Sequence, residues 1–212
     1  MMNTYNIKEQ SGRSMVEMLG VLAIVGVLSI GGIAGYSNDM AKYKINKTLD
    51  QVSMLITNVR TTYGNQTSYK GLTVANAIKY ELVGTDLTLG SSNSLTDAYG
   101  STVEINAAQS TGEECGNETY CPMFTVSFTG LDRAACATIA SSDWGGTASS
   151  GLVAMQITGN STALKALEYA SLGGGVHGWE KTYTAETSLP IEYTQAFEDC
   201  SGTTNTITWL YN

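Results

Sequence analysis

Charged side chains, proline and histidine are all scarce in this chain of 212 residues. Only 14% of the residues are charged, so Ser, Thr, Asn and Gly supply much of the polarity. Acidic residues outnumber basic ones by 19 to 11, which gives a net charge of −8. A chain with this charge has no long-range attraction for phosphates, and we expect no nucleic-acid binding.

Sequence signatures of common enzyme classes are also absent. The chain has no GxxxxGK[ST] phosphate-binding loop, no GxSxG nucleophile elbow and no HExxH zinc motif. His177 has no second histidine or nearby cysteine, so we expect a loop residue rather than a metal ligand. Glu113, Glu114 and Glu118 would suit calcium in principle, but a solvated acidic loop is the simpler interpretation. We therefore expect no enzymatic activity, no metal and no cofactor.

The four cysteines are dispersed and form no CxxC pair: Cys115, Cys121, Cys136 and Cys200. An even number without that spacing favours two disulfides over a zinc site, with buried free thiols as the alternative. Disulfides persist in the periplasm or outside the cell, so the cysteines indicate export. Three pairings of four cysteines are possible, and the spacing alone does not choose among them.

One long apolar run, from Met18 to Tyr36, contains no charged residue. As a helix it would be about 28 Å long, which matches the hydrocarbon core of a bilayer. An ordinary signal peptide has a shorter apolar region followed by its cleavage site, whereas here a polar stretch comes first. A plain membrane anchor is the other alternative. Glu17, at the start of the run, would cost a few kcal/mol in lipid unless it is paired, which predicts a functional role.

Residues 12–28, GRSMVEMLGVLAIVGVL, resemble the signal region of type IV pilins and pseudopilins. The resemblance implies that a prepilin peptidase cuts between Gly12 and Arg13 and that Arg13 is then N-methylated. Glu17 becomes the fifth residue of the mature chain. In the filament it would pair with the freed amine of a neighbouring subunit and set the axial register; a glutamate that reaches out from the helix end is the alternative. Ala34 stands where many type IVa members have proline, which shifts the resemblance toward type IVb.

Glycines interrupt the apolar run at Gly26, Gly31, Gly32 and Gly35. Gly31 and Gly35 have the GxxxG spacing that lets helix backbones approach closely. Each glycine also weakens a helix by up to about 1 kcal/mol relative to alanine. We expect this stretch to assist subunit assembly and to extend within a filament; ordinary small residues of a membrane helix are the alternative.

Beyond Tyr36 the helical pattern becomes amphipathic. Apolar residues recur at spacings of three and four and form one stripe: Ile45, Leu49, Val52, Ile56, Val59 and Tyr63. Polar residues fall mostly on other faces: Lys44, Lys47, Asp50, Gln51 and Arg60. The stripe predicts a half-helix against which a C-terminal domain folds, and Gly64-Asn65 ends it.

The rest of the chain predicts an α+β fold, in which the long helix packs on an antiparallel sheet. Residues 65–100 are expected to connect the helix to the sheet through a short helix near Val74–Tyr80 and polar turns. Alternating apolar residues predict strands at residues 102–105, 124–129, 152–158 and 207–211. Short helices are expected at residues 132–140, 164–170 and 194–199.

The pilin resemblance also implies a disulfide pairing. A long disulfide-bounded C-terminal region is typical of type IVb pilins, and Cys136 with Cys200 would close such a region. Cys115 and Cys121 would then close a small loop. In the chain-entropy model the two bridges contribute roughly 4 and 2 kcal/mol.

Together these features predict four segments: a leader at 1–12, a transmembrane and filament-core helix at 13–36, its amphipathic half at 37–63, and a globular domain at 64–212. The predicted function is that of a structural subunit of a type IVb-like pilus for adhesion, aggregation or conjugative contact. Before assembly the subunit would be anchored in the bacterial inner membrane, where it would bind the prepilin peptidase and the assembly platform. It would then polymerise with itself into a filament outside the cell. A minor pilin, a type II secretion pseudopilin and a membrane-anchored exported binding domain are the alternatives.

Overall fold

The computed structural model describes residues 11–90, 94–109, 114–145, 150–159, 182–184 and 189–212. The chain divides into two compact units, Met1–Tyr43 and Lys44–Asn212. One helix, α1 (Ser11–Tyr63), supplies residues to both units.

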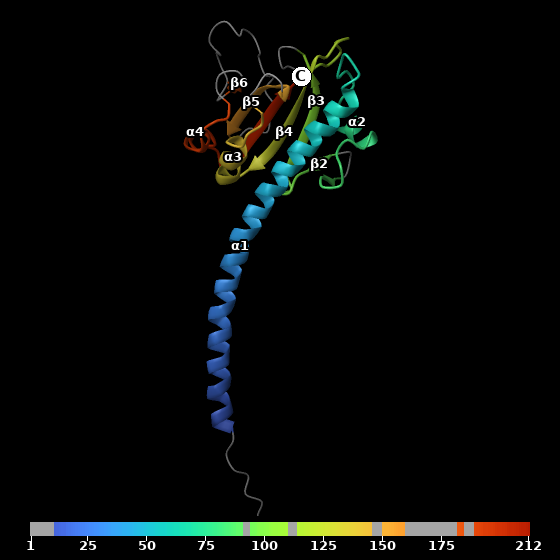
Figure 1. Ribbon diagram of the computed structural model, residues 1–212. Helices are drawn as coiled ribbons and strands as arrows, with labels where there is room; N and C mark the ends of the chain where they lie inside the picture. Colours follow the sequence, from blue (N-terminus) through green and yellow to red (C-terminus); the bar gives the residue numbers. More distant parts are fainter. Residues whose placement is uncertain (1–10, 91–93, 110–113, 146–149, 160–181, 185–188) are drawn as a thin grey trace, which may run out of the picture. The chain divides into compact units, whose positions relative to one another are not determined.

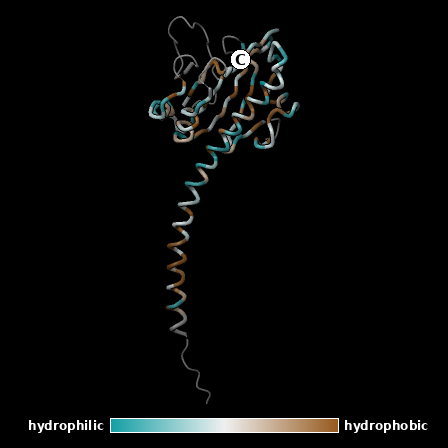
Figure 2. The backbone as a smooth tube through the Cα atoms, in the orientation of Figure 1, coloured by the Kyte–Doolittle hydropathy of each residue, from teal (hydrophilic) through white to brown (hydrophobic). Residues whose placement is uncertain are grey.

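The first unit consists of the N-terminal part of α1, and its large apolar side chains are exposed from Met15 to Tyr36. Figure 2 shows this part of the helix as the brown stretch of α1. Among the described residues, α1 is the one helix that is long and apolar enough to span a membrane. The expectation of a long apolar N-terminal helix is therefore confirmed.

In the second unit, the C-terminal part of α1 packs against the sheet through the predicted stripe. Val52 and Val59 are fully buried, and so is Leu55. Burying a side chain of this size contributes about 1.5–3 kcal/mol. Helix α1 ends at Tyr63, immediately before Gly64, as expected.

Gln51 differs from its expected place on the polar face, because its side chain is 2% exposed. Its amide donates to the Asp86 carbonyl at 2.7 Å and accepts from the Ala98 N–H at 3.3 Å. Loop backbone therefore packs over this part of the helix, and the amide satisfies groups that water would otherwise solvate.

The sheet has seven strands among the described residues, and every pairing in it is antiparallel. Its order is β1-β2-β3-β4-β7-β5-β6. The strands are β1 (Thr88–Leu89), β2 (Leu95–Thr96), β3 (Thr102–Ala108), β4 (Met123–Leu131), β5 (Leu152–Gly159), β6 (Thr182–Thr184) and β7 (Asn205–Tyr211). Figure 1 shows α1 crossing the face of this sheet near β3 and β4.

Strand β7 comes last in the sequence but lies in the middle of the sheet, between β4 and β5. Every second residue of β7 lies opposite an apolar residue of β4: Ile207, Trp209 and Tyr211 pair with Phe128, Val126 and Phe124. These six side chains are buried in one cluster with the stripe of α1. The predicted packing of a long helix on an antiparallel sheet is therefore confirmed.

Three short helices complete the described fold: α2 (Val74–Lys79), α3 (Arg133–Ala140) and α4 (Tyr193–Asp199). Thr73 caps α2 and Asp132 caps α3, each accepting from a backbone N–H in the first turn. All three coincide with expected helices; the helix expected at 164–170 lies outside the described residues.

Two disulfides cross-link the second unit, Cys115–Cys121 and Cys136–Cys200. The longer bridge joins α3 to the C-terminal end of α4 across 64 positions of sequence. This is the pairing that the pilin resemblance implied.

The sequence did not reveal β1, β2 or β6. Strands β1 and β2 are two residues long and lie within the segment that was expected to contain only turns and a helix. Strands of this length have too few residues for an alternating pattern to appear.

Candidate functional site: the N-terminal helix segment

The predicted cleavage site lies in the first turn of α1, which begins at Ser11 and includes Gly12 and Arg13. Arg13 and Glu17 are four positions apart in the sequence. Glu17 is exposed and is the only charged residue between Arg13 and Asp39. The helix therefore presents a single carboxylate at the start of a long apolar surface.

The apolar surface extends around this part of α1 rather than along one stripe. Exposed side chains on successive turns include Leu19, Leu22, Val25, Leu28 and Ile33. Ser29 does not interrupt it, because its hydroxyl donates to the Val25 carbonyl at 2.7 Å. A helix that is apolar on every side must be covered by lipid or by other apolar helices.

The glycines of this segment leave open notches on the helix surface. A Cβ atom added at Gly26, Gly31 or Gly35 would have no neighbouring atom within 4 Å. Gly31 and Gly35 are one turn apart and lie on the same face. Another backbone could therefore approach closely at this point.

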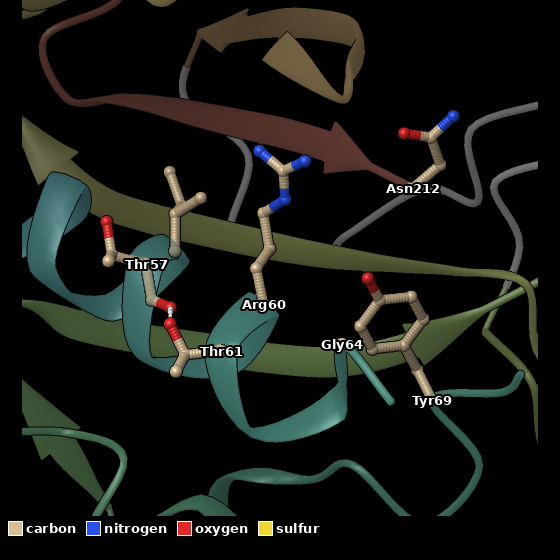
Figure 3. Close-up of a pocket in the computed structure, with 7 residues that line it drawn as sticks. Thr57, Arg60, Thr61, Gly64, Tyr69 and Asn212 are labelled. Atoms are coloured by element: carbon tan, nitrogen blue, oxygen red, sulfur yellow. Dashed lines mark hydrogen bonds between the residues drawn. The ribbon is translucent and has the colours of Figure 1, made fainter. Parts of the chain in front are cut away.

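The structure also shows a pocket that the sequence did not suggest. Seven residues line it: Ile56, Thr57, Arg60, Thr61, Gly64, Tyr69 and Asn212 (Figure 3). The residues come from the end of α1, the following loop and the end of β7. A single arginine in an amphipathic helix carries no sequence signal for a pocket, because the other walls are distant in the chain.

Metal-binding geometry is not found in the described part of the chain, where no three His, Cys, Asp or Glu residues lie close enough to hold an ion. Glu114 is exposed and accepts from the Asn106 amide at 3.0 Å, and Glu118 is also exposed. Glu113 and His177 lie outside the described residues.

Comparison with known proteins gives one family and a set of related structures. The Bundlin family model matches residues 38–195. The crystal structure of a type IVb pilin from Salmonella typhi matches with a TM-score of 0.50 and 17% identity, covering 77% of this chain and 97% of that one. TcpA, a type IV pilin from Vibrio cholerae El Tor, matches with a TM-score of 0.49 and 16% identity, covering 80% and 99%. A search of curated protein sequences gives no significant match.

The family match covers most of the second unit and includes the part of α1 that packs on the sheet. The match to the Salmonella typhi structure covers most of both chains and shows a shared fold. The chain therefore belongs to the Bundlin family and has the fold of a type IVb pilin.

Proposed function

We propose that this pilin is a filament subunit that is cut between Gly12 and Arg13 and polymerised through residues 13–36. The observation that carries the proposal is one exposed acid, Glu17, at the start of an exposed apolar helix attached to a pilin-like domain. Before assembly, lipid covers this helix; in the filament, the same helices of neighbouring subunits cover it. Residues 1–12 are the leader, 37–63 the amphipathic half of the helix, and 64–212 the globular domain.

Within this proposal, Glu17 is neutralised by the α-amine that cleavage creates at Arg13 of a neighbouring subunit. A buried carboxylate without a partner costs several kcal/mol, so subunits in the wrong register would be disfavoured. Methylation of Arg13 would leave the amine positively charged and therefore able to pair. The prepilin peptidase and an inner-membrane assembly platform are the partners that this route requires.

The glycine-containing stretch has a separate proposed role. Gly26, Gly31 and Gly35 allow close helix approach, and the stretch extends by losing helical hydrogen bonds in the filament. The open space around each glycine and the low helix propensity of the residue support this proposal. A filament map with continuous helix through residues 26–35 would contradict the extension.

The proposed filament serves adhesion, aggregation or conjugative contact at the cell surface. The test is mass spectrometry of sheared surface material combined with electron microscopy. We expect filaments whose main protein begins at Arg13, with or without one methyl group. A functional monomer that retains residues 1–12 would contradict the proposal and favour a plain membrane anchor.

A further inference from the structure

The guanidinium group of Arg60 is held in a fixed position beside the pocket. Its Nη1 donates to the Ser150 carbonyl. Gly151 adopts a φ of +74°, and a Cβ atom there would lie 2.6 Å from Nη2 of Arg60. The positive φ favours glycine at this position, and the backbone of Gly151 lies close against the guanidinium of the half-buried Arg60.

Arg60 has no acidic partner among the described residues, although the chain has an excess of acids. The hydrogen bond to the Ser150 carbonyl uses Nη1. The Nε and Nη2 hydrogens of Arg60 have no partner among the residues that the structure describes. These two groups form the edge of arginine that binds both oxygens of a carboxylate.

The other side chains that line the pocket are uncharged. Figure 3 shows the Arg60 guanidinium and the Tyr69 hydroxyl pointing toward the end of β7, where Asn212 lies. Arg60 opposes the effect of burial on the pKa values of Tyr69 and Tyr211, which places its charge near both phenols. Thr57 and Thr61 already donate to carbonyls one turn earlier. Ile56 supplies an apolar wall.

We propose that this pocket binds a carboxylate, with Arg60 contacting both oxygens and the Tyr69 hydroxyl donating to one of them. A single cation among uncharged side chains suits a monoanion better than a phosphate dianion, whose second charge would remain uncompensated. The pocket volume of about 470 Å³ accommodates a small organic acid or one acidic side chain. The carboxylate comes either from solution or from an Asp or Glu of a second copy of this chain.

The first arm of the test measures binding by the dispersed full-length protein. The isotope-labelled chain in detergent micelles, in a buffer without carboxylates at about pH 7, is titrated with propionate. Propionamide and inorganic phosphate serve as chemical controls. We expect saturable NMR shifts at Gly64, Tyr69 and Asn212 with propionate, and weaker or no binding of the other two compounds. Absence of saturable propionate binding would overturn the proposal.

Variants then assign the binding to Arg60. Arg60→Gln should weaken propionate binding about tenfold or more, since it removes the charge and the paired donors. Arg133→Gln is the matched control, because Arg133 is exposed on α3 and contacts Phe197 instead. We expect its affinity to remain within about twofold of the original. Equal binding by a folded Arg60→Gln chain would overturn the proposal.

Tyr69→Phe keeps the proposal testable if Arg60→Gln does not fold. The phenylalanine preserves the ring contacts with Tyr63 and Phe124, at centroid distances of 5.5 and 4.8 Å, and loses only the hydroxyl. One lost hydrogen bond to a charged ligand should weaken binding by about tenfold. Unchanged propionate affinity in this variant would contradict the proposed site.

Assembled filaments distinguish the two sources of carboxylate. If wild-type filaments no longer bind propionate while micelle-dispersed protein does, a neighbouring subunit fills the pocket. If both bind it, the carboxylate comes from solution; either result supports the pocket's proposed chemistry. The micelle arm does not require a filament, so failure of the proposed assembly function would leave this inference standing.

Discussion

Asp97 is a buried acid whose carboxylate accepts hydrogen bonds from the turn at residues 97–101. Its Oδ1 accepts from the N–H groups of Tyr99 and Ser101, at 2.9 and 2.8 Å. Its Oδ2 is buried without a hydrogen-bond partner among the described residues. Burial raises the pKa of this carboxyl, while the hydrogen bonds and then the charge of Lys44 oppose the rise. The net effect is a pKa above the ordinary value of the group, so folding favours its neutral form.

We predict that Asp97→Asn changes stability in a pH-dependent way. Because the folded pKa lies above 3.8, the contribution of Asp97 is complete below that pH and is lost as the pH rises through the folded pKa. The asparagine keeps an oxygen acceptor but does not titrate. The free energy of unfolding of wild type minus Asp97→Asn should therefore be larger near pH 3 than near pH 7.

Urea unfolding of the full-length chain in micelles, followed by Trp fluorescence, measures this difference. Asp50→Asn is the matched control, because Asp50 is exposed on α1. A difference that is constant, or that grows toward neutral pH, would contradict the prediction. The buried amide that Asp97→Asn introduces adds a cost of about 1–3 kcal/mol at every pH and does not alter the sign of the trend.

Among the elements, α3 and α4 depend most on a covalent link. They have few residues each, yet Cys136 and Cys200 are fully buried between them. Each of these helices is too short to be stable alone in water. The bridge therefore limits how far the two helices separate when the domain opens.

We predict that removing the long bridge costs more stability than removing the short one. Cys136→Ala with Cys200→Ala should lower the free energy of unfolding by about 4 kcal/mol, and Cys115→Ala with Cys121→Ala by about 2 kcal/mol, because the longer loop gains more unfolded-state entropy. Denaturant unfolding of both double variants without reductant makes the comparison. An equal or greater loss from the short-loop variant would show that packing, not loop length, determines the cost.

How far the sequence predicts these elements depends on how local their signals are. The alternation of Phe124, Val126 and Phe128 lies within one strand, so β4 was recognisable. The insertion of β7 between β4 and β5 is a long-range pairing and leaves no local pattern. Gln51 and Arg60 look like ordinary polar helix residues, because the loop carbonyls that they bind are distant in sequence.

For the whole molecule, charge opposes assembly and apolar surface favours it. Lys8 and Glu9 cancel within residues 1–12, so cleavage would leave the side-chain charge at −8. Subunits with this charge repel one another until they are within contact range. The exposed apolar residues of α1 must therefore provide most of the attraction, and such non-directional attraction does not define a register.

Glu17 supplies the missing specificity in our proposal, and substitution tests it. We predict that Glu17→Ala leaves the unfolding of the globular domain unchanged, because Glu17 lies outside that unit. The same variant should give no filaments, or filaments with an altered axial rise, in sheared surface fractions viewed by electron microscopy. Glu118→Ala, which removes an exposed acid from the globular unit, should assemble normally.

Glu17→Gln separates pairing from a simple preference for a polar residue at the helix end. If Glu17 only reached toward solvent, a neutral glutamine would serve equally well and filaments would form normally. If it neutralises the amine of Arg13, glutamine would leave a buried positive charge without a partner, at a cost of several kcal/mol per subunit. Because every subunit in a filament would carry this cost, Glu17→Gln should be as defective in assembly as Glu17→Ala.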